Sequence, residues 1–149
     1  MKSWKIKIFI GVLILFTAAA AGLHLLTRES IPEHQLLINV RGNDSYVDID
    51  KLEFETVTGI RVNGKGEEIP VEAPGISLQD VLVHAGVEHF EHAVIESDDS
   101  YRAEVSQAEI REEGKVYLLE DEDESLRLIV FGDKDSKRSV SNVVKLIVE

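Results

Sequence analysis

Short runs of β-favouring residues, each bounded by turn-forming residues, repeat along most of this chain of 149 residues. The runs are rich in Val, Ile, Thr, Leu and aromatic side chains, and several of them alternate apolar with polar positions. They cover residues 36–40, 56–62, 67–71, 93–95, 101–105, 116–119, 126–131 and 142–148. Only short helices fit between such runs, so the pattern predicts an α+β domain that is mostly β.

Local signals place the turns and helices between these strands. Asn63-Gly64 predicts a hairpin turn, and Pro70 and Pro74 limit its second strand to an edge or a short strand. Three segments have the side chains that begin a helix, with an oxygen-bearing N-cap and an acid three residues later. They begin at Asp50, Ser77 and Ser106, and the second is predicted to end at Gly86.

The N-terminal part is basic and then apolar. Lys2, Lys5 and Lys7 precede residues 8–26, which contain no acid and would rise about 28 Å as a helix. This length predicts a transmembrane anchor, while the small residues at 18–21 leave a cleaved signal segment open. The lysines favour a cytoplasmic N-terminus, so the rest of the chain is expected outside the cytoplasm.

The chain therefore divides into four predicted parts. A basic cytoplasmic segment over residues 1–7 precedes the transmembrane segment over residues 8–26. Residues 27–35 are polar, contain Pro32 and are predicted to form a tether, and residues 36–149 form the folded domain. The expected location is the cell membrane with a single span, or the exterior after signal cleavage.

Charge and cysteine content exclude several classes of function. From Glu29 onward the chain has 28 acidic residues against 12 basic ones, which leaves a formal charge of −16. Such a surface repels nucleic acid, so a nucleic-acid partner is not expected. The chain has no cysteine, which excludes disulfides, thiolate metal sites and cysteine nucleophiles.

A charged glycine loop between the last two predicted strands is the first candidate site. The backbone of a glycine and nearby cations can hold a phosphate, and the loop has both. Alternatively, the loop is solvated and its cations pair with Asp133 and Asp135. The candidate residues are Gly132, Lys134, Ser136, Lys137 and Arg138.

Three other polar segments were considered. Ser97, Asp98 and Tyr101 belong to a predicted turn, where Asp98 could accept from the amino group of a ligand and where turn chemistry explains the same residues. The histidines at 84, 89 and 92 follow no complete ligand motif, and the acids at 120–124 lack the calcium-loop pattern. No metal site is predicted from them.

Five motifs follow one another along the folded domain: GISLQDVL at 75–82, AGV at 85–87, SDDSY at 97–101, LRLIVFGD at 126–133 and KRSV at 137–140. Taken in this order, they resemble the oxidoreductase molybdopterin-binding domain of the sulfite oxidase family. The resemblance covers residues 36–149, and it implies a mostly β, mixed-sheet fold with the glycine loop near the phosphate end of a molybdopterin.

The chain departs from that family at the metal ligand. The family's cysteine lies in the segment that corresponds to residues 55–63, where this chain has Arg61 and Val62. Ser100, Phe131 and Ser139 also replace a glycine, a proline and an aromatic residue of the pattern. The expected function is therefore a ligand- or partner-binding module without its own catalysis, which contacts a membrane or exported protein. The alternative is a molybdopterin-dependent oxidoreductase that lacks the cysteine ligand.

Overall fold

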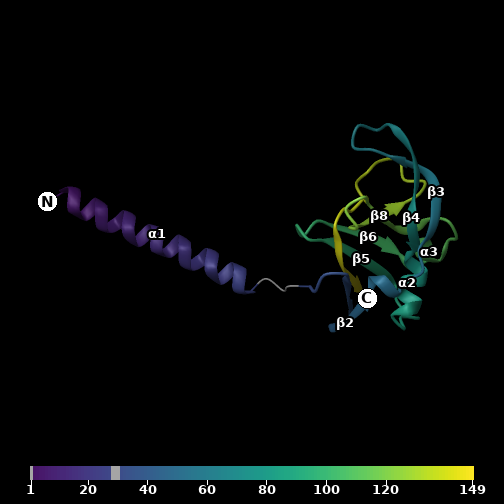
Figure 1. The fold of residues 1–149 in the computed structure, drawn as a ribbon, viewed down its shortest axis with the longest axis horizontal. Helices are drawn as coiled ribbons and strands as arrows, with labels where there is room; N and C mark the ends of the chain where they lie inside the picture. The colour runs from purple at the N-terminus through teal and green to yellow at the C-terminus, as the bar shows by residue number, and fades with distance from the viewer. Residues whose placement is uncertain (1, 28–30) are drawn as a thin grey trace. The chain divides into compact units, whose positions relative to one another are not determined.

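The computed structural model describes residues 2–27 and 31–149 (Figure 1). The chain separates into two compact units, Met1–Ser30 and Ile31–Glu149. The first unit contains helix α1 (Lys2–Thr27), and the second contains every strand. Of the predicted tether, residues 28–30 lie outside the described residues, and residues 31–34 belong to the second unit.

The prediction of a transmembrane helix over residues 8–26 is wrong. The segment is helical as part of α1, but no helix within residues 2–27 and 31–149 is long and apolar enough to cross a membrane. The prediction rested on the length of the acid-free run, whose 19 residues are close to the roughly 20 that a span needs.

The first sheet of the second unit has five strands in the order β2-β1-β9-β5-β6. All neighbours are antiparallel except β1 and β9, which are parallel, so the sheet is mixed as predicted. The strands are β1 (Gln35–Val40), β2 (Asn43–Asp48), β5 (His92–Ser97), β6 (Arg102–Ser106) and β9 (Val143–Val148).

The second sheet has four antiparallel strands in the order β3-β4-β7-β8. The strands are β3 (Glu55–Val62), β4 (Glu68–Ser77), β7 (Val116–Glu120) and β8 (Leu126–Val130). Strand β4 pairs with β7 only over Gly75–Ser77, so its first part is a sheet edge, which accommodates Pro70 and Pro74. The prediction of a mostly β domain is confirmed.

Strand β2 was not predicted, because its sequence NDSYVD is polar. It forms because Arg41 and Gly42 both have positive φ, at 48° and 87°, between the paired residues Val40 and Asn43. Two positive φ values in a two-residue loop are typical of a type I′ hairpin turn. The turn returns the chain beside β1, so that β2 becomes the edge of the first sheet.

Three short helical segments connect the strands: η1 (Ile49–Lys51), α2 (Leu78–His84) and α3 (Gln107–Arg111). The Ser77 hydroxyl accepts from the Asp80 N–H at 3.0 Å, and Gly86 follows the helix with φ of 75°, as predicted. Ser106 and Glu109 form the predicted capping box at the start of α3. The segment predicted to begin with Asp50 as its N-cap is a single 3-10 turn whose N-cap is Asp48, two residues earlier.

One apolar core contains side chains from both sheets, α2 and α3. Its fully buried members include Leu36, Leu78, Ile95, Leu128 and Leu146. In β5 and β6, buried positions alternate with more exposed ones, and the buried side chains form one side of this core. The core fixes α2 against β4 and β7, which determines the surroundings of the site described below.

A second, smaller apolar cluster lies on the other face of the four-stranded sheet. It contains Val57, Leu119 and Ile129, with the partly buried rings of Tyr117 and Phe131 in an edge-to-face contact at 5.9 Å. Strand β3 bends over this cluster, because a Cβ built on Gly59 would lie 2.4 Å from the Phe131 ring. The β3–β4 hairpin therefore reaches the glycine loop, which follows β8 (Figure 1).

Candidate functional site

The predicted glycine loop lies between β8 and β9. Gly132 has φ of 90°, so it takes the left-handed conformation that glycine allows, and the chain turns there. The tip of the β3–β4 hairpin lies beside the loop, since a Cβ on Gly64 would be 3.8 Å from the Ser136 hydroxyl. The loop is therefore packed against a neighbour rather than standing open.

Arg138 is held between two carboxylates. Its Nε donates to Asp133 Oδ2 at 2.9 Å, and its Nη1 donates to Glu109 Oε1 at 2.9 Å and Oε2 at 3.1 Å. The hydrogen bond with Asp133 is the main reason why the pKa of Arg138 is raised, and the bond with Glu109 adds to it. The guanidinium thus links the loop to α3, and its charge is already compensated.

Lys137 pairs with Asp135, as expected if the loop is solvated and its cations pair with its own acids. Its Nζ lies 3.3 Å from Asp135 Oδ2, and its backbone N–H donates to Asp135 Oδ1 at 3.0 Å. This backbone hydrogen bond is the main cause of the lowered pKa of Asp135. Lys134 is exposed and makes no ion pair with any residue that the structure describes.

The predicted turn over residues 97–101 connects β5 with β6. Buried Ser97 donates its hydroxyl proton to Asp99, which is the main cause of the lowered pKa of Asp99. Ser100 has φ of 69°, which is the conformation that favours a glycine and matches the glycine of the family's turn. The Asp98 N–H donates to Asn142 O at 3.0 Å.

The structure brings the two predicted site segments together through one hydrogen bond. The Tyr101 hydroxyl donates to the backbone oxygen of Lys137 at 2.5 Å. Tyr101 is otherwise 48% exposed, so its ring lies at the surface beside the loop. The residues of the turn and of the loop therefore share one region of the domain.

The residues in this region do not fit a molybdopterin. Arg61 and Val62, which correspond to the family's cysteine segment, border the loop across a gap of about 10 Å³. A gap of this size is just large enough for one water molecule. Asp133 and Asp135 also line it, and they are already paired with Arg138 and Lys137. The chain has no thiolate to offer a metal.

The histidines do not form a centre either. His92 Nε2 lies 3.5 Å from the side-chain oxygen Oε2 of Glu149, and His89 is exposed on the loop after α2. Within residues 2–27 and 31–149, no three potential ligands are grouped so that they could hold a metal ion. His84 belongs to a different feature of the surface.

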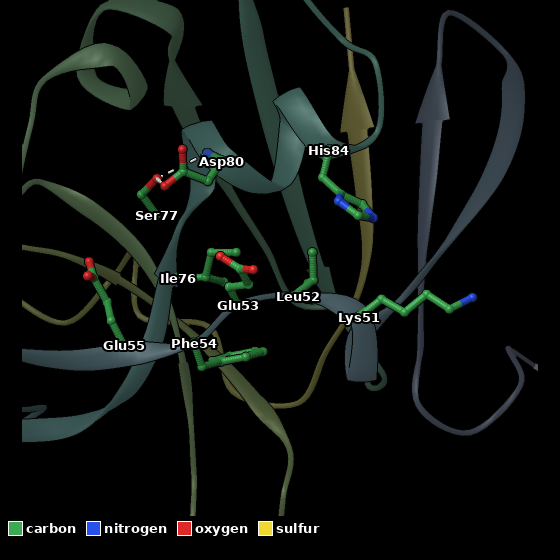
Figure 2. Close-up of a pocket in the computed structure, with 9 residues that line it drawn as sticks. All are labelled: Lys51, Leu52, Glu53, Phe54, Glu55, Ile76, Ser77, Asp80 and His84. Carbon is green, nitrogen blue, oxygen red and sulfur yellow. Dashed lines mark hydrogen bonds between the residues drawn. The ribbon is translucent and has the colours of Figure 1, made fainter.

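That feature is a pocket of about 690 Å³ beside α2, shown in Figure 2 and called here the α2 pocket. Three separate parts of the chain build it: the segment from η1 to β3, the end of β4, and α2. Its lining residues are Lys51, Leu52, Glu53, Phe54, Glu55, Ile76, Ser77, Asp80 and His84.

The floor of the α2 pocket is apolar and fixed by the main core. Leu52 and Ile76 are only 7% and 6% exposed, and the partly buried Phe54 packs against the same core. The N-cap of α2 defines one wall, because Ser77 donates its hydroxyl proton to Asp80 Oδ2 at 2.6 Å. The pocket therefore stands on η1, β3, β4 and α2, together with the short connection over residues 52–54.

The rim of the α2 pocket is charged. In Figure 2, Glu55 and Asp80 lie on one side, Lys51 and His84 lie on the other, and Glu53 lies between them. Lys51 Nζ is 3.2 Å from the Asp48 carboxylate, which lies outside the pocket lining. The pocket thus combines a buried apolar surface with mainly negative side chains.

A second pocket, of about 400 Å³, contains the predicted residue Asp98. It lies between residues 31–35 and the turns at 123–126 and 142–144. Three of its residues, His34, Glu124 and Asn142, have positive φ. This pocket is smaller and rests on turns, so the α2 pocket is the better-built candidate.

No protein-family model matches the chain, and no curated protein matches it significantly. The resemblance to the molybdopterin-binding domain therefore stays a prediction, carried by the motifs alone.

The sequence did not reveal the α2 pocket. Ser77 and Asp80 indicate a helix start, and residues 50–53 indicate a helical turn. The pocket arises instead from the placement of three segments around one floor. A sequence signal existed only in the acids at 53, 55 and 80 on either side of a predicted hairpin.

Proposed function

We propose that the domain of residues 31–149 is a binding module that holds a small organic ligand in the α2 pocket. The supporting observation is a pocket of about 690 Å³ whose floor is formed by the buried side chains of Leu52 and Ile76. Small-molecule sites are typically concave, of about 300–1,000 Å³, and combine an apolar lining with a few polar groups. The α2 pocket has this size and an apolar floor of Leu52, Phe54 and Ile76, and its six other lining residues are polar or charged.

The arrangement of the polar groups favours binding over chemistry at this pocket. The Ser77 hydroxyl accepts from one backbone N–H and donates to Asp80, so both its functions serve the start of α2. A serine nucleophile typically gives its proton to a base such as histidine, and His84, the histidine of the pocket, makes no hydrogen bond with Ser77 in the described part of the chain. The remaining polar groups stand at the rim, where they orient a ligand.

The molybdopterin-dependent oxidoreductase has no comparable support. Two of the loop cations that would hold the cofactor, Lys137 and Arg138, are compensated by Asp135, Asp133 and Glu109, and Lys134 is left as the third. The gap beside them measures about 10 Å³. The predicted location outside the cytoplasm and the predicted exported partner stay predictions.

Blocking the pocket tests the proposal. The probes are 2-phenylethylamine and 2-phenylethanol, titrated into the full-length chain with ¹³C-labelled Leu and Ile methyl groups. We expect the methyl signals of Leu52 and Ile76 to shift on binding. The His84→Trp variant places a large ring at the pocket rim and is expected to weaken binding about tenfold, which corresponds to about 1.4 kcal/mol.

Val83→Trp is the matched control, because Val83 is the preceding residue of α2, is 59% exposed and does not line the pocket. It is expected to bind both probes as the unmodified chain does. The proposal fails if neither probe shifts the Leu52 and Ile76 signals, or if the two Trp variants bind alike.

A further inference from the structure

In the described part of the chain, the carboxylates of the α2 pocket are not paired with a basic side chain, whereas several other carboxylates of this domain are. The side chains of Glu53 and Glu55 form no ion pair or hydrogen bond with any residue in the described part of the chain. The Asp80 carboxylate accepts only the Ser77 hydroxyl, and the Asp80 N–H donates back to that hydroxyl as part of the helix cap. Their charges are therefore available to a ligand.

Carboxylates elsewhere show the contrast. Asp133 and Glu109 are compensated by Arg138, and Asp121 pairs with Arg127 at 2.9 Å. In these pairs an incoming cation would first have to displace an arginine. At the α2 pocket it meets two acids without a bound base, beside an apolar floor.

The charges of the α2 pocket are also unevenly distributed across its floor. Glu55 and Asp80 stand on one side of the floor, and Lys51 stands on the other (Figure 2). A cationic group is attracted to the first side and repelled from the second. An apolar group attached to it would then lie over Leu52, Phe54 and Ile76, where it removes apolar surface from water.

We propose that the ligand of the α2 pocket is an organic cation, with a primary ammonium or guanidinium group carried on an apolar body about the size of one ring. This inference rests on the proposed function, because it names the class of ligand for the same pocket. The charge of the whole domain supports it, since residues from Glu29 onward carry a formal charge of −16 that attracts cations.

A series of three probes with nearly the same shape tests the charge of the ligand. The probes are 2-phenylethylamine, 2-phenylethanol and phenylacetate, which are cationic, neutral and anionic at neutral pH. Binding to the full-length chain is followed by the Leu52 and Ile76 methyl signals. We expect the amine to bind about tenfold more tightly than the alcohol, and the anion to bind most weakly.

Two double variants separate the pocket carboxylates from the general charge of the domain. Glu53→Gln with Glu55→Gln is expected to weaken amine binding about fivefold to tenfold and to leave alcohol binding unchanged. Glu104→Gln with Glu122→Gln changes the net charge equally at exposed positions outside the pocket, and is expected to change amine binding less than twofold. Lys51→Gln is expected to strengthen amine binding.

The outcomes distinguish the two proposals. If the alcohol binds in the pocket and the amine binds no more tightly, the ligand is not selected by its charge, and only the present inference fails. If the Glu104 and Glu122 double variant weakens the amine as much as the pocket variant, the inference fails as well. If none of the three probes shifts the Leu52 and Ile76 signals, the proposed function itself is wrong.

Discussion

Gly59 shows at the scale of one residue how closely the second sheet bends. Its missing side chain leaves room for the Phe131 ring, three atoms of which lie within 2.8 Å of the position that a Cβ would occupy. A contact this short forces the ring or the strand to move. Gly59 therefore permits β3, which contributes Val57 to the small apolar cluster, to approach the Phe131 ring closely.

The substitution Gly59→Ala is expected to lower the free energy of unfolding by about 1–3 kcal/mol, because the new methyl group displaces the Phe131 ring. Urea denaturation of the full-length chain measures the change. In the background of Phe131→Leu, whose side chain is smaller, the same substitution should cost at least about 1 kcal/mol less. Equal costs in the two backgrounds would show that the ring is not the obstacle.

At the scale of the element, the β3–β4 hairpin differs from its prediction in the position of the critical glycine. The sequence Asn63-Gly64 predicted a hairpin turn between residues 62 and 67. In the structure Gly66 N donates to Asn63 O at 3.0 Å, and Gly66 has φ of 80°. The Asn63 side chain accepts from the N–H groups of Lys65 and Glu67, each at 2.9 Å. The hairpin therefore has a three-residue loop with Gly66 in the left-handed position.

This loop gives a matched pair of substitutions. Gly66→Ala is expected to lower the free energy of unfolding by about 1 kcal/mol, since an L-residue resists positive φ. Gly64→Ala has no positive φ to adopt and meets only ordinary contact distances, so it should be neutral or slightly stabilising. Thermal unfolding monitored by circular dichroism compares the two, and an equal loss for both would contradict the assigned turn.

At the scale of the whole molecule, Arg138 connects parts that are distant in the sequence. It joins the loop after β8 to α3 through Asp133 and Glu109, and the three side chains are 29%, 21% and 25% exposed. Burial raises the pKa of Glu109, but the hydrogen bonds from the Ser106 N–H and from Arg138 outweigh it, so the pKa is lowered. The stability of the fold is therefore linked to pH through this carboxylate.

The sign of the pH dependence follows from that lowered pKa. The stabilisation by Glu109 is complete above the pKa of an unfolded glutamate, about 4.3, and is lost as the pH falls through the lower folded value. Glu109→Gln keeps a residue that a capping box accepts but removes the charge. It is expected to cost about 1–2 kcal/mol at pH 7 and less at pH values below about 4.

Urea denaturation at a series of pH values measures this difference. Glu104→Gln, at an exposed position of β6, is the control and should cost little at any pH. A cost for Glu109→Gln that stays constant from pH 7 to about 3 would contradict the linkage to Arg138.

The amino-acid sequence by itself determined the local features of this protein. Seven of the eight predicted runs became strands with boundaries close to those expected, and the run at 67–71 became the longer strand β4. The N-caps Ser77 and Ser106 also lie where they were predicted, because strand propensity and capping depend on neighbouring residues.

Only the tertiary structure decided the features that depend on distant residues. Strand β1 lies inside a sheet because β9, from much later in the chain, pairs with it, and Arg138 is compensated because α3 brings Glu109 to it. The α2 pocket exists because the main core sets α2 beside the segment that leads into β3. Charge pairing and concave surfaces depend on distances between segments, and the order of residues along a chain does not specify those distances.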